Sequence, residues 1–283
     1  MLINRSQENI ERLMDMSYRM RKMALDMALS AGEKGSHVGG GFSCIEIMAT
    51  LYGEVLKISP EVAKEKERNR LLISKNHCTL AHFTALACTG FIEEKELVTY
   101  SQNGSRLIGY PYNPELGLEY SGGSLGMAIS VGVGQALSAK KKGQPQRVYV
   151  LMGDGELNEG SIWEAFMSAA QFKLGNLTAI IDRNHLCYDG ETEEVMAIDD
   201  LGAKMKAFNW QVINCNGHDI GDLLRAFSEI KEDGDVPSII IADTIKGKGL
   251  SFAEGRPEWH QKALSQEQYE QALSELEGYK TWK

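Results

Sequence analysis

Residues 147–190 constrain the fold of this chain more than any other stretch. They open with the apolar run VYVLM, typical of a buried strand, which leads directly into the turn Gly153-Asp154-Gly155. Apolar residues then recur at helical spacing from Ser161 to Leu174, and a second apolar run covers Leu177 to Ile181. The order strand, turn, helix, strand predicts two parallel strands joined by a helix.

The rest of the chain continues this alternation. We predict a helix over residues 199–208, a strand over 210–215, a helix over 219–230 and a strand over 237–242. The pattern predicts an α/β fold, a parallel sheet with helices on both faces. We expect one domain over residues 1–283, with residues 1–60 as amino-terminal helices and a loop packed on it, and residues 261–283 as a carboxy-terminal helix.

The amino-terminal region carries its own helix signals. Ser6 is a capping residue for a helix that we expect to reach about Ala31, with methionines on its buried face. A glycine-dense loop, GEKGSHVGGGFS, is expected next. The spacing of Ser43 and Glu46 then predicts a capping box for a second helix that reaches about Leu56.

Composition excludes several classes of function. The 283 residues, 43% of them hydrophobic, suffice for a full globular core, and no apolar run is long enough to span a membrane. A net charge of −9 argues against a nucleic-acid surface. The five cysteines lack metal-site spacing and read as reduced thiols. The amino terminus has no signal-peptide pattern, so we expect a cytoplasmic protein.

Two polar side chains follow neighbouring predicted strands. Asp154 comes after the first strand of the central segment and Asn184 after the second, so both are expected at the carboxyl edge of the sheet, where open α/β folds bind ligands. Their oxygens suit Mg²⁺, which usually keeps water and phosphate oxygens in its shell. The helix after Asp154 points free N–H groups at the same place, which favours a diphosphate.

A Gly-Asp-Gly turn alone is a weak signal, but here it is tied to a strand, a helix, a second strand and a terminal Asn. The whole run, GDGELNEGSIWEA…KLGNLTAIIDRN…DG, resembles the thiamine diphosphate motif of the transketolase family. The resemblance implies thiamine diphosphate with Mg²⁺ (or Ca²⁺ or Mn²⁺) as cofactors. It implies metal ligands from Asp154, Asn184 and the Leu186 carbonyl, and cofactor contacts from Gly153, Gly155 and Glu156.

Further segments match family motifs around histidines. His37 corresponds to the histidine of an A-x-x-G-H loop, His77 to that of S-x-G-H, and His260 to that of W-H-G-K. The resemblance implies that these histidines contact cofactor and substrate, and their ordinary pKa near neutrality suits proton transfer. The chain departs from the motifs at Asn76 and Gln261, where the family has glycine, and lacks the proline after His37.

The remaining implied contacts are more varied. Gly123, Ser124 and Leu125 match the family's GSLG segment along the cofactor. Lys246 is a candidate for the cofactor's phosphates, and Lys75 is either a cofactor contact or a solvent-facing lysine. Glu159 either joins a hydrogen-bond path between cofactor sites across a dimer, as the resemblance implies, or simply favours the helix dipole. Tyr110 stands where the family has a substrate-contacting histidine, and a neutral phenol cannot replace imidazole as a proton shuttle.

The resemblance implies transfer of a two-carbon ketol unit from a ketose to an aldose, with sugars or sugar phosphates as substrates. No second α/β series follows to bind the aminopyrimidine of the cofactor. We therefore expect an amino-terminal subunit that is active only with a carboxy-terminal partner subunit, in a two-plus-two heterotetramer. Two alternatives stay open: the alpha subunit of a thiamine-dependent 2-oxo acid dehydrogenase, which shares the motif, and a degenerate subunit kept for binding or regulation.

Overall fold

The structure, a computed structural model, describes residues 2–120, 122–231 and 234–279. Within these residues, one five-stranded sheet runs in the order β1-β2-β3-β5-β4, and every neighbouring pair is parallel. The strands are β1 (Arg70–Ile73), β2 (Val148–Gly153), β3 (Leu177–Arg183), β4 (Gln211–Asn216) and β5 (Ser238–Asp243). The predicted fold class is thus confirmed.

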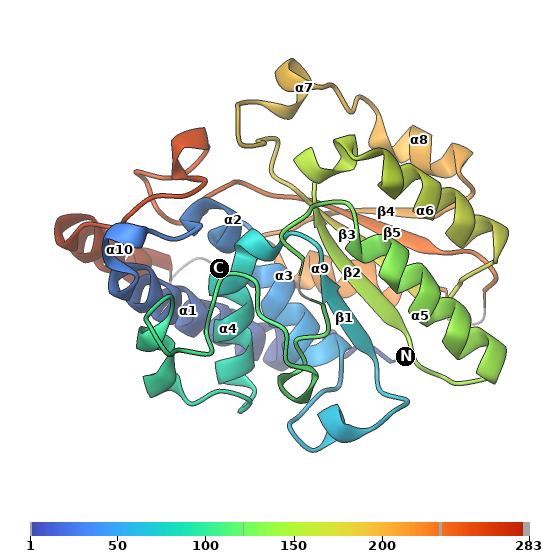
Figure 1. Ribbon diagram of the computed structural model, residues 1–283, viewed down its shortest axis with the longest axis horizontal. Helices are drawn as coiled ribbons and strands as arrows, with labels where there is room; N and C mark the ends of the chain where they lie inside the picture. Colours follow the sequence, from blue (N-terminus) through green and yellow to red (C-terminus); the bar gives the residue numbers. More distant parts are fainter. Residues whose placement is uncertain (1, 121, 232–233, 280–283) are drawn as a thin grey trace.

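Helices cover both faces of the sheet (Figure 1). One face packs against α1 (Gln7–Ser30), α3 (Ile45–Thr50), α4 (Thr79–Cys88) and α9 (Ile220–Ser228). The other packs against α5 (Ala128–Lys142), α6 (Gly160–Gln171) and α8 (Leu201–Ala207). Because successive strand residues point to opposite faces, Tyr149 and Leu151 of β2 join the first core while Val148, Val150 and Met152 join the second.

The register of the central strands sets the position of the site. Gly153 at the end of β2 pairs with Asp182 near the end of β3. The turns that follow these strands therefore open side by side at one edge of the sheet, as the sequence predicted. The turn after β1 joins them, because β1 pairs with β2 from Arg70 to Ile73.

The predicted glycine-dense loop is wrong over residues 38–42. Residues Val38–Phe42 form the short helix α2, and its glycines are buried. A Cβ on Gly40 would lie 2.4 Å from His77 Cδ2, and one on Gly39 would lie 2.8 Å from the Trp259 carbonyl oxygen. These glycines let neighbouring segments approach closely, a role that composition alone does not distinguish from flexibility.

The predicted capping box at Ser43 is also wrong. Ser43 follows α2, and its hydroxyl donates to Asp182 Oδ2 at 2.6 Å instead of capping α3. Glu46 forms a buried ion pair with Arg21 of α1. The second helix continues beyond α3 as a π-helical turn, Leu51–Val55. Tertiary partners outcompete the local capping pattern at both residues.

The remaining helices agree with the sequence more closely. Ser6 caps α1 by accepting from Asn9 N at 3.3 Å, as predicted. The short helix α7 covers Thr192–Val195, and the carboxy-terminal helix α10 covers Gln266–Tyr279 and binds α1 through Tyr269 and Asp26. No helix in the described ranges has both the length and the apolar character needed to cross a bilayer.

Candidate active site

A cavity of about 410 Å³ opens at the carboxyl edge of the sheet. Most of the residues that the sequence singled out line it: His37, Asn76, His77, Tyr110, Gly123, Leu125, Gly153, Asp154, Gly155, Glu156, Asn184, Leu186, Lys246 and His260. They come from segments far apart in the sequence, so their convergence is a finding of the tertiary structure.

The predicted metal ligands converge at the tips of β2 and β3. Asp154 is buried, and its Oδ2 accepts from the backbone N–H of His185 at 2.6 Å. His185 lies between Asn184 and Leu186 and has a left-handed backbone, φ +63°, which turns its amide toward Asp154. Burial, followed by the neighbouring Asp182 carboxylate, raises the pKa of Asp154. Arg183 Nη1 lies 3.3 Å from Asp154 Oδ2 and opposes the rise, and a further cation near this carboxylate would relieve both unfavourable effects.

The described residues contain no cluster of three or more His, Cys, Asp or Glu side chains suited to a metal. The site instead offers one carboxylate, one carboxamide and one backbone carbonyl. Such an all-oxygen set suits a hard divalent cation that takes its remaining ligands from phosphate and water. The side-chain amide of Asn184 donates to Asp182 Oδ2 at 3.3 Å, which orients the carboxamide.

Lys246 brings a positive charge to the cavity. Its Nζ lies 3.3 Å from the Leu186 carbonyl oxygen, 3.0 Å from that of Cys187 and 3.2 Å from His260 Nδ1. Only 2% of the residue is exposed, and burial, with help from Lys75, lowers its pKa to about 8. Among the described residues no carboxylate forms an ion pair with this ammonium, so a bound anion would stabilise it.

The three predicted histidines form one cluster. The ring centroid of His260 lies 5.4 Å from that of His37 and 5.1 Å from that of His77, and the last two are 6.1 Å apart. Burial is the main cause that lowers the pKa of each ring, to about 3 for His260. The expectation of an ordinary pKa is therefore wrong: near neutral pH the rings are uncharged and can both donate and accept hydrogen bonds.

Glu156 accepts hydrogen bonds from residues of three of the predicted motifs. Its Oε1 accepts from the backbone N–H of Gly126 at 2.7 Å and from the Ser74 hydroxyl, while Oε2 accepts from Gly153 N at 3.2 Å. Burial raises the pKa of this carboxyl, and these donors oppose the rise. Glu156 lines the cavity and also fixes the turns around it.

Three predicted site residues do not line the cavity. Lys75 is fully buried, forms an ion pair with Asp182 and donates to the Gly40 carbonyl at 3.0 Å. Lys75 therefore supports the residues that line the cavity without lining it itself. Ser124 and Glu159 are exposed to solvent outside the cavity. Glu159 precedes α6 and makes no side-chain capping bond there.

Sequence reasoning missed several residues of this region. Asp182 accepts hydrogen bonds from Ser43, Lys75, Thr244 and Asn184, and its spacing of two from Asn184 at a strand end was an available signal. Tyr188 was not identifiable: its ring packs edge-on against His260, with centroids 5.0 Å apart. Asn158, Cys187, Asp189 and Val195 also line the cavity.

The sequence matches a family model described as "Transketolase, thiamine diphosphate binding domain" over residues 14–281. It is 40% identical over 267 residues to an apulose-4-phosphate transketolase subunit of Phocaeicola vulgatus, covering 94% of each chain. It is 37% identical over 260 residues to a 6-deoxy-6-sulfo-D-fructose transketolase subunit of a Clostridium species, covering 91% of this chain and 94% of that one.

Solved structures agree with these sequence matches. Transketolase from Leishmania mexicana superposes with a TM-score of 0.85 at 26% sequence identity. The match covers 94% of this chain but 41% of the other. The chain thus spans less than half the length of this solved relative.

Proposed function

Because the chain belongs to the transketolase family, we propose that it is the amino-terminal subunit of a two-chain transketolase that transfers a two-carbon ketol unit from a ketose to an aldose. One observation carries the proposal: Asp154, Asn184 and the Leu186 carbonyl share a cavity with Lys246 and the histidine cluster. The family matches favour this function over a 2-oxo acid dehydrogenase subunit or a degenerate subunit.

The residues of the cavity fit thiamine diphosphate and a divalent cation. Asp154, Asn184 and the Leu186 carbonyl would hold the cation, with Mg²⁺ as the proposed metal and Ca²⁺ or Mn²⁺ as alternatives. Lys246 would bind a phosphate oxygen, since its ammonium is buried without a carboxylate among the described residues. When bound, the cofactor supplies a nucleophilic thiazolium carbon.

The three histidines would form hydrogen bonds with the sugar substrate. His37, His77 and His260 present uncharged rings to one space, so they can accept a hydrogen bond from a sugar hydroxyl or donate one to a carbonyl oxygen. Lys246 contacts His260 Nδ1 at 3.2 Å, which couples the phosphate-binding cation to the cluster. Glu159 lies outside the cavity, where its proposed role in a path between cofactor sites requires a second subunit.

The names of the relatives narrow the substrate class. They act on apulose 4-phosphate and on 6-deoxy-6-sulfo-D-fructose, both sugars with an anionic terminus. We propose a ketose with a phosphate or sulfonate terminus for this chain too. Tyr110 lies at the cavity and is half exposed, which supports the proposal that its phenol would contact the substrate where the family motif has imidazole.

The partner is a carboxy-terminal transketolase subunit that completes the cofactor site, a proposal supported by the names of the relatives, which describe each of them as one subunit of a transketolase. A two-plus-two heterotetramer is the proposed assembly, and the cytoplasm the proposed location. We expect no ketol transfer from this chain alone, transfer when the two subunits are mixed, and none when Asp154→Ala replaces the wild-type chain. Transfer by the isolated chain, or by an assembly with Asp154→Ala, would refute the proposal.

A further inference from the structure

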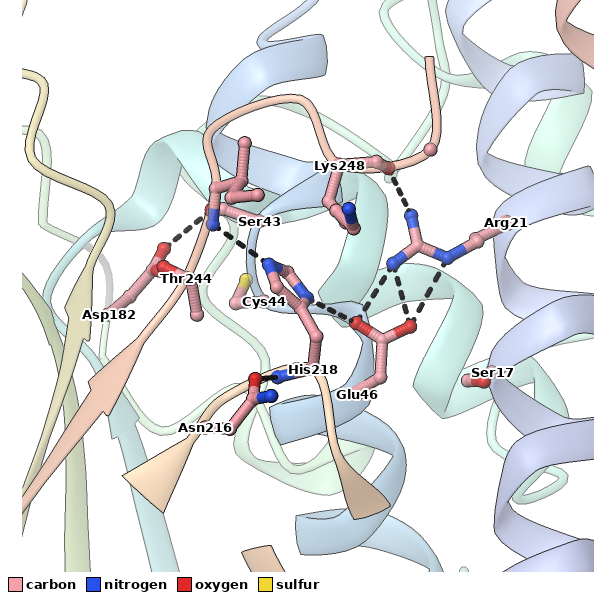
Figure 2. A network of polar contacts seen from close by, with 12 residues as sticks. Ser17, Arg21, Ser43, Cys44, Glu46, Asp182, Asn216, His218, Thr244 and Lys248 are labelled. Carbon is pink, nitrogen blue, oxygen red and sulfur yellow. Dashed lines mark hydrogen bonds and ion pairs between the residues drawn. The ribbon is translucent and has the colours of Figure 1, made fainter. Parts of the chain in front are cut away.

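A buried polar network lies behind the active site and outside its cavity. Glu46 of α3 stands between Arg21 of α1 and His218 of the loop between β4 and α9 (Figure 2). Arg21 Nη2 donates to both Glu46 oxygens, at 2.6 and 2.8 Å, and His218 Nδ1 lies 3.0 Å from Glu46 Oε2. The three residues join helices and a loop that are distant in the sequence.

The network holds the chain on both sides of Lys246. The backbone N–H of Ile245 donates to His218 Nε2 at 2.8 Å, and Arg21 Nη1 donates to the Lys248 carbonyl at 2.5 Å. Since Ile245 supplies a donor, His218 Nε2 must accept, and its proton therefore sits on Nδ1 facing Glu46. A single neutral tautomer satisfies both contacts.

Charge pairing keeps the Glu46 carboxylate ionised inside the network. Burial raises the pKa of Glu46, but the Arg21 charge and the His218 contact outweigh it and bring the pKa to about 2. The carboxylate thus stays ionised and paired. Arg21 is 1% exposed and also lies over the Phe42 ring, 5.7 Å from its centroid, so both ions are fixed by packing as well as by charge.

The loop that the network holds is otherwise irregular. Between Thr244 and Gly249 it forms no helix or strand, and Gly247 and Gly249 have positive φ angles of 75° and 91°. A Cβ on Gly247 would lie 2.6 Å from the Ala253 carbonyl oxygen. The loop therefore depends on specific hydrogen bonds for its shape, and Lys246 extends from it into the cavity.

We propose that His218, backed by Glu46 and Arg21, is a positioning residue that holds the Thr244–Gly249 loop so that Lys246 faces the cofactor's phosphates. The part concerning phosphates rests on the proposed function. The part concerning the loop stands on the contacts themselves. None of the three residues lines the cavity, so they act through the loop and not on a ligand.

Two substitutions at one position separate the contacts. The amide of His218→Asn reaches about as far as Nδ1, so it can still donate to Glu46 but loses the acceptor for Ile245. The amide of His218→Gln reaches about as far as Nε2, so it can still accept from Ile245. Arg68→Met is the matched control, because it breaks another buried ion pair, with Glu119, beside the amino end of β1, away from the cavity.

The test measures hydrogen exchange by mass spectrometry on the full chain, and affinity for thiamine diphosphate with Mg²⁺ by calorimetry on the chain assembled with its partner subunit. For His218→Asn we expect about tenfold faster exchange in residues 244–249 and about tenfold weaker binding, the worth of one hydrogen bond. His218→Gln should stay near wild type, and Arg68→Met should lose thermal stability without either effect.

Equal exchange of residues 244–249 in His218→Asn and Arg68→Met would overturn the proposal, as would faster exchange with unchanged affinity. Equal losses of exchange protection and cofactor affinity in His218→Asn and His218→Gln would also overturn it, since the contact with Ile245 would then not contribute. If the wild-type chain, with its partner subunit, binds no thiamine diphosphate, the proposed function fails. The exchange data alone would then decide whether His218 holds the loop.

Discussion

Replacing Lys75 with methionine should destabilise this protein strongly. Lys75 and Asp182 form an ion pair in which both side chains are fully buried. Lys75→Met keeps most of the side-chain volume but leaves Asp182 without its counter-ion. The hydroxyls of Ser43 and Thr244 and the amide of Asn184 remain as its side-chain donors. Removing one member of such a pair typically costs about 3–5 kcal/mol. For a chain of this size that corresponds to a fall in Tm of roughly 6–20 °C.

The contribution of this ion pair to wild-type stability should be constant between about pH 5 and pH 9. Burial raises the pKa of Asp182, but Lys75 and the other donors outweigh it and leave the pKa below its ordinary value. Its contribution is therefore complete above the unfolded value of about 3.9 and is lost only as pH falls through the lower folded value. The Lys75 pKa is raised by Asp182 despite burial, so its contribution is lost only above about pH 10.

Calorimetric melting of wild type, Lys75→Met and the double variant Lys75→Met/Asp182→Leu at pH 7 is the assay. The double variant should recover part of the loss, because it removes the unpaired buried charge. A single variant that melts within about 2 °C of wild type, less than 1 kcal/mol at this size, would refute the reasoning. A double variant no more stable than the single one would refute the account based on the unpaired charge.

Three further predictions concern the cavity. Lys246→Met should weaken thiamine diphosphate binding roughly 10–100-fold. The affinity of the wild-type protein for the cofactor should fall as pH rises through about 8, where Lys246 loses its proton. A cofactor affinity that calorimetry finds unchanged from pH 6.5 to 9 would contradict this. Gly40→Ala should lower the free energy of unfolding by about 1–3 kcal/mol, because the added Cβ would clash with the His77 ring. Gly134→Ala is the control, because no atom lies within 4 Å of the added Cβ. Its free energy of unfolding should rise by about 0.5–1 kcal/mol, and calorimetric melting measures both variants. Tyr110→His should change the KM for the sugar several-fold, about the worth of one hydrogen bond, with cofactor affinity unchanged; equal changes in both would argue against a substrate contact.

Local patterns were sufficient for much of this protein. The apolar runs and the Gly-Asp-Gly turn located β2 and β3 to within two residues, and the alternation of elements predicted the parallel sheet. The side-by-side strand tips that carry Asp154 and Asn184 followed from that order alone. Periodicity and turn chemistry are properties of neighbouring residues, so the sequence determines them directly.

Tertiary structure decided the rest. The placement of β5 between β3 and β4, the pairing of Lys75 with Asp182 across 107 residues, and the burial that suppresses the charge of His260 depend on distant segments meeting. For the same reason Ser43, which locally resembles a helix cap, serves Asp182 instead. Burial and long-range hydrogen bonds outweigh local preference at these residues, and they exist only once the chain has folded.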